Sequence, residues 1–163
     1  VFGFEESYGY LTGSYVRDKD GVDGAYMICE MFSYYATQGI SLLDRLDELY
    51  KTYGYCLNTL HSYEFDGSAG FARMQSIMQA FRGGIKEFGG KKVVRLLDYI
   101  QGLDGLPKSD VLKFLLEDNC SLVVRPSGTE PKLKIYISVS AENKEMAEEV
   151  EDEIAKTAEK WIC

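Results

Sequence analysis

A nine-residue run near the C-terminal end of the chain, KLKIYISVS, alternates apolar and polar side chains without interruption. Successive side chains of a β-strand point to opposite faces, so this run predicts a strand with one buried face and one open face. An apolar run, CSLVVRPSG, precedes it and predicts a second strand. The expected buried face is Leu133, Ile135, Ile137 and Val139, and the expected open face is Lys132, Lys134, Tyr136 and Ser138.

The segment between these two strands, RPSGT, carries more polar groups than a simple reversal of the chain requires. Arginine offers a planar fork that suits phosphate, and serine and threonine add hydroxyl donors. A glycine lets backbone N–H groups come close to an anion. The alternative is a hairpin turn whose polar residues bind nothing. The expected anion-binding set is Arg125, Ser127, Gly128 and Thr129. Lys132 and Lys134 lie two apart on one strand, so both are expected to share a face and to add positive potential to this set.

Two polar stretches near the start of the chain are weaker candidates for ligand contacts. In FEESYGY, Glu5 and Ser7 place a carboxylate and a hydroxyl two residues apart, a pair that suits the vicinal hydroxyls of a sugar. A solvated acidic turn is the alternative. In RDKDG, Lys19 stands between two aspartates, either as a solvated charge or as a cation held for a phosphate. The segment DKDGVD does not fit a calcium loop, because Asp23 stands where glycine is required.

The rest of the chain predicts an α+β or mixed α/β protein. Apolar periodicity and capping residues favour helices over residues 20–39, 41–54, 67–84, 109–118 and 142–161. Strands are expected over residues 1–6, 56–65, 92–103, 120–128 and 132–140. The second helix ends at Gly54, where the pattern changes, so a domain boundary is expected between residues 54 and 56.

Composition restricts the class of protein. Hydrophobic residues make up 45% of the 163 residues, as in a packed globular protein, and 26 acidic against 18 basic residues disfavour a nucleic-acid partner. No apolar run is long enough to span a bilayer, so no membrane partner is expected. The four cysteines are scattered and favour reduced thiols in the cytoplasm over disulfides. The single histidine, His61, has no evident triad partner and is expected to be structural or exposed.

The three polar stretches, taken in order, carry a family resemblance. GFEESYGY, VRDKDG and RPSGTEPKLKIY resemble the C-terminal part of the α-D-phosphohexomutase superfamily, which includes phosphoglucomutase and phosphomannomutase. The resemblance implies that residues 1–55 are the end of that family's domain three. Residues 56–163 would then be domain four, an α+β unit similar to the TATA-box-binding protein. The chain also begins without methionine, so it is expected to be a piece of a longer protein.

The resemblance also implies a function. Such enzymes interconvert hexose 1-phosphates and hexose 6-phosphates through a bisphosphate intermediate, with glucose 1,6-bisphosphate as activator. Glu5 and Ser7 would bind sugar hydroxyls, Lys19 would be an active-site lysine, and the RPSGT loop with Lys134 would hold the phosphate that does not react.

The family's phosphoserine and Mg²⁺ loops have no match in this chain. No catalytic or metal residue is therefore expected in it, and the chain alone is expected to be inactive. Its expected partners are the phosphorylated sugar and the missing N-terminal domains. Phosphopentomutase, phosphoglucosamine mutase and a non-catalytic phosphosugar-binding module remain alternatives.

Overall fold

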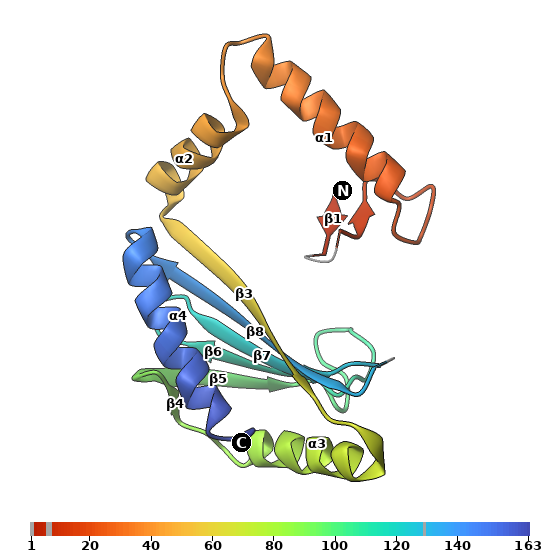
Figure 1. The fold of residues 1–163 in the computed structure, drawn as a ribbon, viewed down its shortest axis with the longest axis vertical. Coiled ribbons are helices and arrows are strands. Elements are labelled where there is room, and N and C mark those ends of the chain that lie inside the picture. Colours follow the sequence, from red (N-terminus) through yellow and green to blue (C-terminus); the bar gives the residue numbers. More distant parts are fainter. Residues whose placement is uncertain (1, 6–7, 129) are drawn as a thin grey trace. The chain divides into compact units, whose positions relative to one another are not determined.

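The computed structural model describes residues 2–5, 8–128 and 130–163. The chain divides into two compact units, Val1–Thr52 and Tyr53–Cys163. Figure 1 traces helices and antiparallel strands through both of them. The α+β prediction is confirmed.

The first unit consists of a small hairpin followed by two helices. Strands β1 (Gly3–Phe4) and β2 (Tyr10–Leu11) pair antiparallel. Helix α1 (Gly21–Ala36) begins after Asp20, whose carboxylate accepts hydrogen bonds from two backbone N–H groups of the first turn, at 2.9 and 3.1 Å.

Helix α2 (Leu42–Tyr53) begins with the expected capping box. The Ser41 N–H donates to the Asp44 carboxylate at 3.1 Å, and the Asp44 N–H donates to the Ser41 hydroxyl at 3.0 Å. Two otherwise unpartnered N–H groups at the helix start are thereby satisfied, as the sequence predicted.

The described residues of the first unit form no apolar core. Among its described residues only Gly9 and Gly24 are buried. The apolar positions that recur at helical spacing along α1 are exposed, and Val22 and Tyr26 keep 83% and 66% of their surface accessible. The described residues therefore show no packed interior around the helices of this unit.

The second unit is built on a twisted antiparallel sheet with the strand order β3-β8-β7-β6-β5-β4. Helices α3 (Gly67–Arg82) and α4 (Lys144–Glu159) follow β3 and β8 along the chain. The strands span Tyr55–Glu64 (β3), Glu87–Phe88 (β4), Lys91–Asp98 (β5), Leu112–Leu116 (β6), Ser121–Pro126 (β7) and Lys132–Ala141 (β8).

The sequence prediction is wrong over residues 99–118. The helix expected over residues 109–118 is instead β6, and the strand expected over 92–103 ends at Asp98, before a loop over residues 99–111. Leu112, Phe114 and Leu116 alternate with less buried residues and enter the core. Hydrogen bonding to β5 on one side and β7 on the other outweighs the helical spacing of the leucines.

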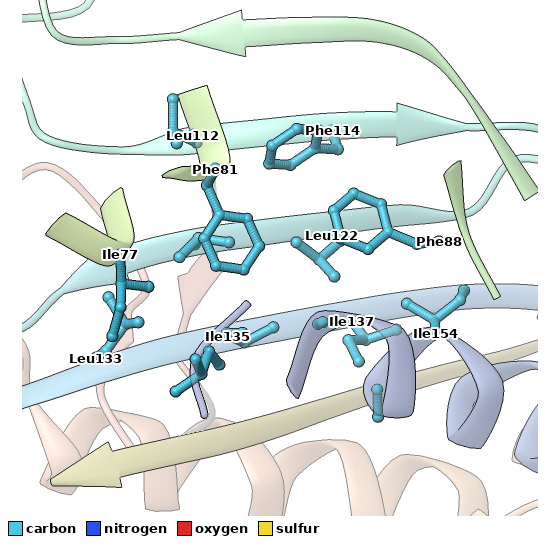
Figure 2. Packing of buried hydrophobic residues seen from close by; sticks show 14 of the residues in the cluster. Ile77, Phe81, Phe88, Leu112, Phe114, Leu122, Leu133, Ile135, Ile137 and Ile154 are labelled. Carbon is cyan, nitrogen blue, oxygen red and sulfur yellow. The ribbon is translucent and has the colours of Figure 1, made fainter. Parts of the chain in front are cut away.

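Both helices of this unit cover the same face of the sheet. Figure 2 shows Ile77 and Phe81 of α3 and Ile154 of α4 packed with Phe114, Leu122 and the alternating apolar side chains of β8. Phe81, Phe88 and Phe114 pack ring against ring, with centroids 5.1–6.3 Å apart. The buried residues of β8 are the four that the alternation predicted, Leu133, Ile135, Ile137 and Val139.

Candidate functional site

The opposite face of the sheet carries the cations of the candidate phosphate site. Arg125, near the end of β7, is the direct cross-strand partner of Lys134 on β8. Their neighbours Val124 and Ile135 are buried in the core, so Arg125 and Lys134 point to the open face. Arg125 is exposed and Lys134 is half-buried. The β7–β8 pairing thus brings together two residues that are nine positions apart in the sequence.

Within the residues that the structure describes, no carboxylate forms an ion pair with Arg125 or Lys134. Lys132, two residues before Lys134, differs. Its ammonium lies 3.4 Å from Glu64 and 3.4 Å from Glu130, and hydrogen bonds to these two carboxylates raise the pKa of Lys132. The charge of Lys132 is thus compensated within the protein, whereas the Arg125–Lys134 pair presents its charge to solvent.

The turn between β7 and β8 is held by its own backbone. The Ser127 N–H donates to the Lys132 carbonyl at 2.7 Å, and the Glu130 N–H donates to the Ser127 hydroxyl at 3.3 Å. The Ser127 N–H therefore closes the turn and does not join an anion-binding nest. A Cβ added at Gly128 would meet nothing within 4 Å, which leaves open space beside the turn. Thr129 lies outside the described residues.

The first unit holds the candidate sugar-binding residues. The Lys19 ammonium lies 3.0 Å from the Glu5 carboxylate, and about half of each side chain is exposed, at 53% and 51%. The Glu5 N–H donates to the Gly9 carbonyl at 2.8 Å and closes the loop that follows β1. The structure thus brings Glu5 and Lys19 together as an accessible ion pair. Ser7 lies outside the described residues.

Gly9 is a site residue that the sequence reasoning missed. A Cβ at this position would lie 2.3 Å from Cδ of Lys19 and 3.3 Å from a carboxylate oxygen of Glu5. The Lys19 side chain therefore passes over the backbone of Gly9 on its way to Glu5. The only signal in the sequence was a glycine directly after Tyr8. In the structure, Tyr8 has a positive φ of 62°, which marks a tight loop at this point.

His61 has a structural partner. Its Nε2 lies 2.7 Å from a carboxylate oxygen of Glu151 on α4, and the Thr59 hydroxyl donates to the same oxygen at 2.6 Å. These contacts join the edge strand β3 to α4.

In the described part of the chain, no three His, Cys, Asp or Glu side chains gather where they could hold a metal ion. No helix there has the length and apolar character needed to cross a membrane.

Comparison with protein families covers most of the chain. Residues 65–157 match the family model described as "Phosphoglucomutase/phosphomannomutase, C-terminal domain". The chain belongs to the phosphoglucomutase/phosphomannomutase family. Residues 1–53 match a second model of the same family, its "alpha/beta/alpha domain III". The predicted resemblance to this superfamily is confirmed.

Individual relatives agree with this assignment. A phosphoglucomutase of Staphylococcus aureus (strain MSSA476) is 38% identical over 155 residues, which cover 88% of this chain and 28% of the relative. A phosphoglucomutase of Staphylococcus epidermidis is 32% identical over 167 residues, 94% of this chain and 30% of the relative. The chain thus spans less than a third of the length of these family members and corresponds to their C-terminal part.

The fold has a counterpart among solved structures. The open form of parafusin (pp63), an exocytosis-sensitive phosphoprotein of Paramecium described as a phosphoglucomutase, superposes with a TM-score of 0.61. The match covers 96% of this chain and 28% of parafusin, at 19% identity. This likeness shows a shared fold.

Proposed function

We propose that the chain supplies the sugar-binding and phosphate-binding loops of a longer phosphohexomutase, which interconverts hexose 1-phosphate and hexose 6-phosphate through a bisphosphate. The observation that carries this proposal is the cross-strand pair Arg125–Lys134, which presents two cations on an open face without a compensating carboxylate among the described residues. Relatives named phosphoglucomutase favour glucose phosphates as the substrate over the pentose and glucosamine phosphates of related mutases.

The phosphate that does not react would lie on Arg125 and Lys134. Guanidinium and ammonium groups bind phosphate through charge and hydrogen-bond geometry and do not depend on the sugar that carries it. A bisphosphate intermediate must turn around between its two phosphoryl transfers, so the same site has to hold the phosphate of either end. The Ser127 hydroxyl and Thr129, at the adjoining turn, complete the proposed set with the open space beside Gly128.

The sugar hydroxyls would lie on the Glu5 carboxylate, together with Ser7. A carboxylate accepts two hydrogen bonds in fixed geometry, which suits neighbouring hydroxyls. The Lys19 ammonium, 3.0 Å from Glu5, holds this carboxylate in place and adds positive charge next to a phosphorylated ligand. Discrimination between sugars is therefore assigned to this pair, and phosphate capture to the second unit.

Residues 1–55 and 56–163 are proposed as the end of domain three and as domain four of the longer enzyme. Mg²⁺ and a phosphoserine belong to its phosphoryl transfer, but the described residues do not fit a magnesium site, since no cluster of carboxylates is present. No step proposed for this chain passes through a metal, and the chain alone is proposed to be inactive. Glucose 1,6-bisphosphate as activator and a cytoplasmic location are parts of the same proposal.

The function is tested in the longer protein by a coupled assay that converts glucose 1-phosphate to glucose 6-phosphate. Arg125→Ala should lower kcat/KM by roughly tenfold to a hundredfold, the effect of losing a charged hydrogen-bond partner. Arg95→Ala is the matched control, because Arg95 is also exposed and lies on β5 of the same sheet. Equal activity of both variants would contradict the proposal, as would a parent protein that lacks mutase activity.

A further inference from the structure

A pocket of about 330 Å³ lies on the open face of the sheet of the second unit. Its floor is made by Val111, the last residue before β6, by Lys113 of β6 and by Val123 of β7. These residues alternate with the core residues of the two strands, so their side chains point away from the core. Its rim is made by Tyr99 and by Leu106 and Pro107, from the loop over residues 99–111.

The loop that forms the rim is fastened at both ends. Arg82 of α3 donates to Asp98 at 2.8 Å and to Asp110 at 2.5 Å; Asp98 directly precedes the loop, and Asp110 lies near its end. Inside the loop, the carbonyl of Tyr99 accepts from the N–H groups of Gly102 and Ser109, at 2.9 and 3.0 Å. The pocket is therefore preformed, as small-molecule sites commonly are, and its volume falls within their usual range.

The residues that line the pocket favour a ring with an attached anion. They include no carboxylate, and Lys113 forms no ion pair with the described residues. Leu106 keeps 56% of its surface exposed although it is apolar. Tyr99 offers an aromatic ring for stacking, and the ammonium of Lys113 can lie over the face of a bound ring.

The pocket adjoins the Arg125–Lys134 pair. Val123 on its floor and Arg125 are two residues apart on the same face of β7, which is about 7 Å along a strand. We propose that the pocket binds the base of a nucleoside monophosphate, whose phosphate lies on Arg125 and Lys134. The anionic half of this inference rests on the proposed function, whereas the ring-binding half rests on the pocket alone.

Titration of the chain with three probes separates binding of the ring in the pocket from binding of the phosphate at Arg125 and Lys134. Adenosine 5′-monophosphate, inorganic phosphate and adenosine are each added while backbone amide resonances are followed. The monophosphate should shift amides of residues 99–111 together with those beside Arg125, and should bind about tenfold more tightly than inorganic phosphate. Adenosine should shift only the amides around the pocket, and inorganic phosphate only those beside Arg125.

The variant Leu106→Ser removes an apolar wall and should lower the affinity for the monophosphate about tenfold while the affinity for inorganic phosphate stays unchanged. Ile100→Ser is the matched control, because Ile100 is an exposed apolar residue of the same loop that does not line the pocket. The proposal is overturned if adenosine leaves the amides around the pocket unshifted or if both variants weaken the monophosphate equally.

Amides of this face that shift with protein concentration, without ligand, would assign the pocket to a second copy of the chain and also overturn the proposal. Loss of the phosphate response alone, with adenosine still binding, would contradict the proposed phosphate site and leave the pocket assigned to the ring. The two failures are thus distinguishable.

Discussion

Arg125 and Lys134 face each other as cross-strand partners of β7 and β8, with both side chains on the open face of the sheet. Like charges directly opposite each other on neighbouring strands disfavour the folded state. Among the described residues no carboxylate offsets this repulsion, although Lys132, two positions away, contacts Glu64 and Glu130. A bound anion would remove the repulsion, which is why we assign the pair to phosphate.

Replacing Lys134 tests both consequences of the pair, the destabilisation of the fold by like charges and the binding of phosphate. Lys134→Met should leave the free energy of unfolding unchanged or raise it by up to about 1 kcal/mol, because the repulsion is relieved. The same variant should weaken phosphate binding, measured by amide shifts near Gly128. Lys132→Met, which removes two ion pairs, should not stabilise the protein. Unchanged phosphate affinity in Lys134→Met would argue against the site.

Gly9 tests whether the Glu5–Lys19 pair is needed. Gly9→Ala places a methyl group where Lys19 passes and should displace its ammonium from Glu5. Loss of this charged contact predicts a drop of about tenfold in kcat/KM of the longer protein. Gly21→Ala is the control, because a Cβ there meets nothing within 4 Å. An activity of Gly9→Ala equal to that of Gly21→Ala would show that the pair does not contribute.

The contact of Arg82 with Asp98 predicts that the free energy of unfolding of the second unit falls at acidic pH. Burial alone would raise the pKa of Asp98, but hydrogen bonds from Arg82 and from the Ile100 N–H outweigh it and lower that pKa. A carboxyl whose pKa is lowered by folding stabilises the fold at any pH above its pKa in the unfolded chain, which is about 3.9. This contribution is lost as the pH falls below about 4.

Asp98→Asn should therefore lower the free energy of unfolding at pH 7, by about 1–3 kcal/mol, and reduce its decline toward pH 3. Denaturant unfolding at a series of pH values measures both effects. Asp104→Asn, an exposed aspartate of the same loop, serves as control and should leave the curve unchanged. Superimposable pH profiles for the wild type and Asp98→Asn would refute this role of the contact.

The two units should differ in stability when the chain is studied by itself. The second unit has a contiguous apolar core, whereas the first buries only Gly9 and Gly24 among its described residues. Amide hydrogen exchange should show strong protection in β7 and β8 and weak protection in α1 and α2. Protection of α1 that equals that of β8 would mean that its apolar side chains are covered in solution.

Local patterns were enough to predict some elements. The strict alternation over residues 132–140 predicted β8 and its buried face, and Ser41 with Asp44 predicted the start of α2. The segment over residues 109–118 was misassigned, because its leucines fit both periods and the choice depends on pairing with β5 and β7. The pairing partners lie outside the segment, so the local pattern of residues 109–118 does not report them.

The candidate site was predictable only to the level of residue types. The RPSGT composition indicated an anion, but the pairing of Arg125 with Lys134 follows from the register of β7 and β8. Use of the Ser127 N–H to close the turn depends on the geometry of the hairpin. The role of Gly9 depends on a side chain ten residues away, and the pocket near Val123 depends on how the loop over residues 99–111 folds back.

Arg125 is proposed to bind the phosphate, and Glu5 is proposed to bind the sugar hydroxyls. The most direct test is the ratio of kcat/KM for glucose 1-phosphate to that for mannose 1-phosphate, measured in the longer protein. Arg125→Ala should lower both constants by a similar factor, roughly tenfold or more, and preserve the ratio, whereas Glu5→Gln should change the ratio. A ratio that shifts strongly in Arg125→Ala, with both constants lowered equally in Glu5→Gln, would contradict the account.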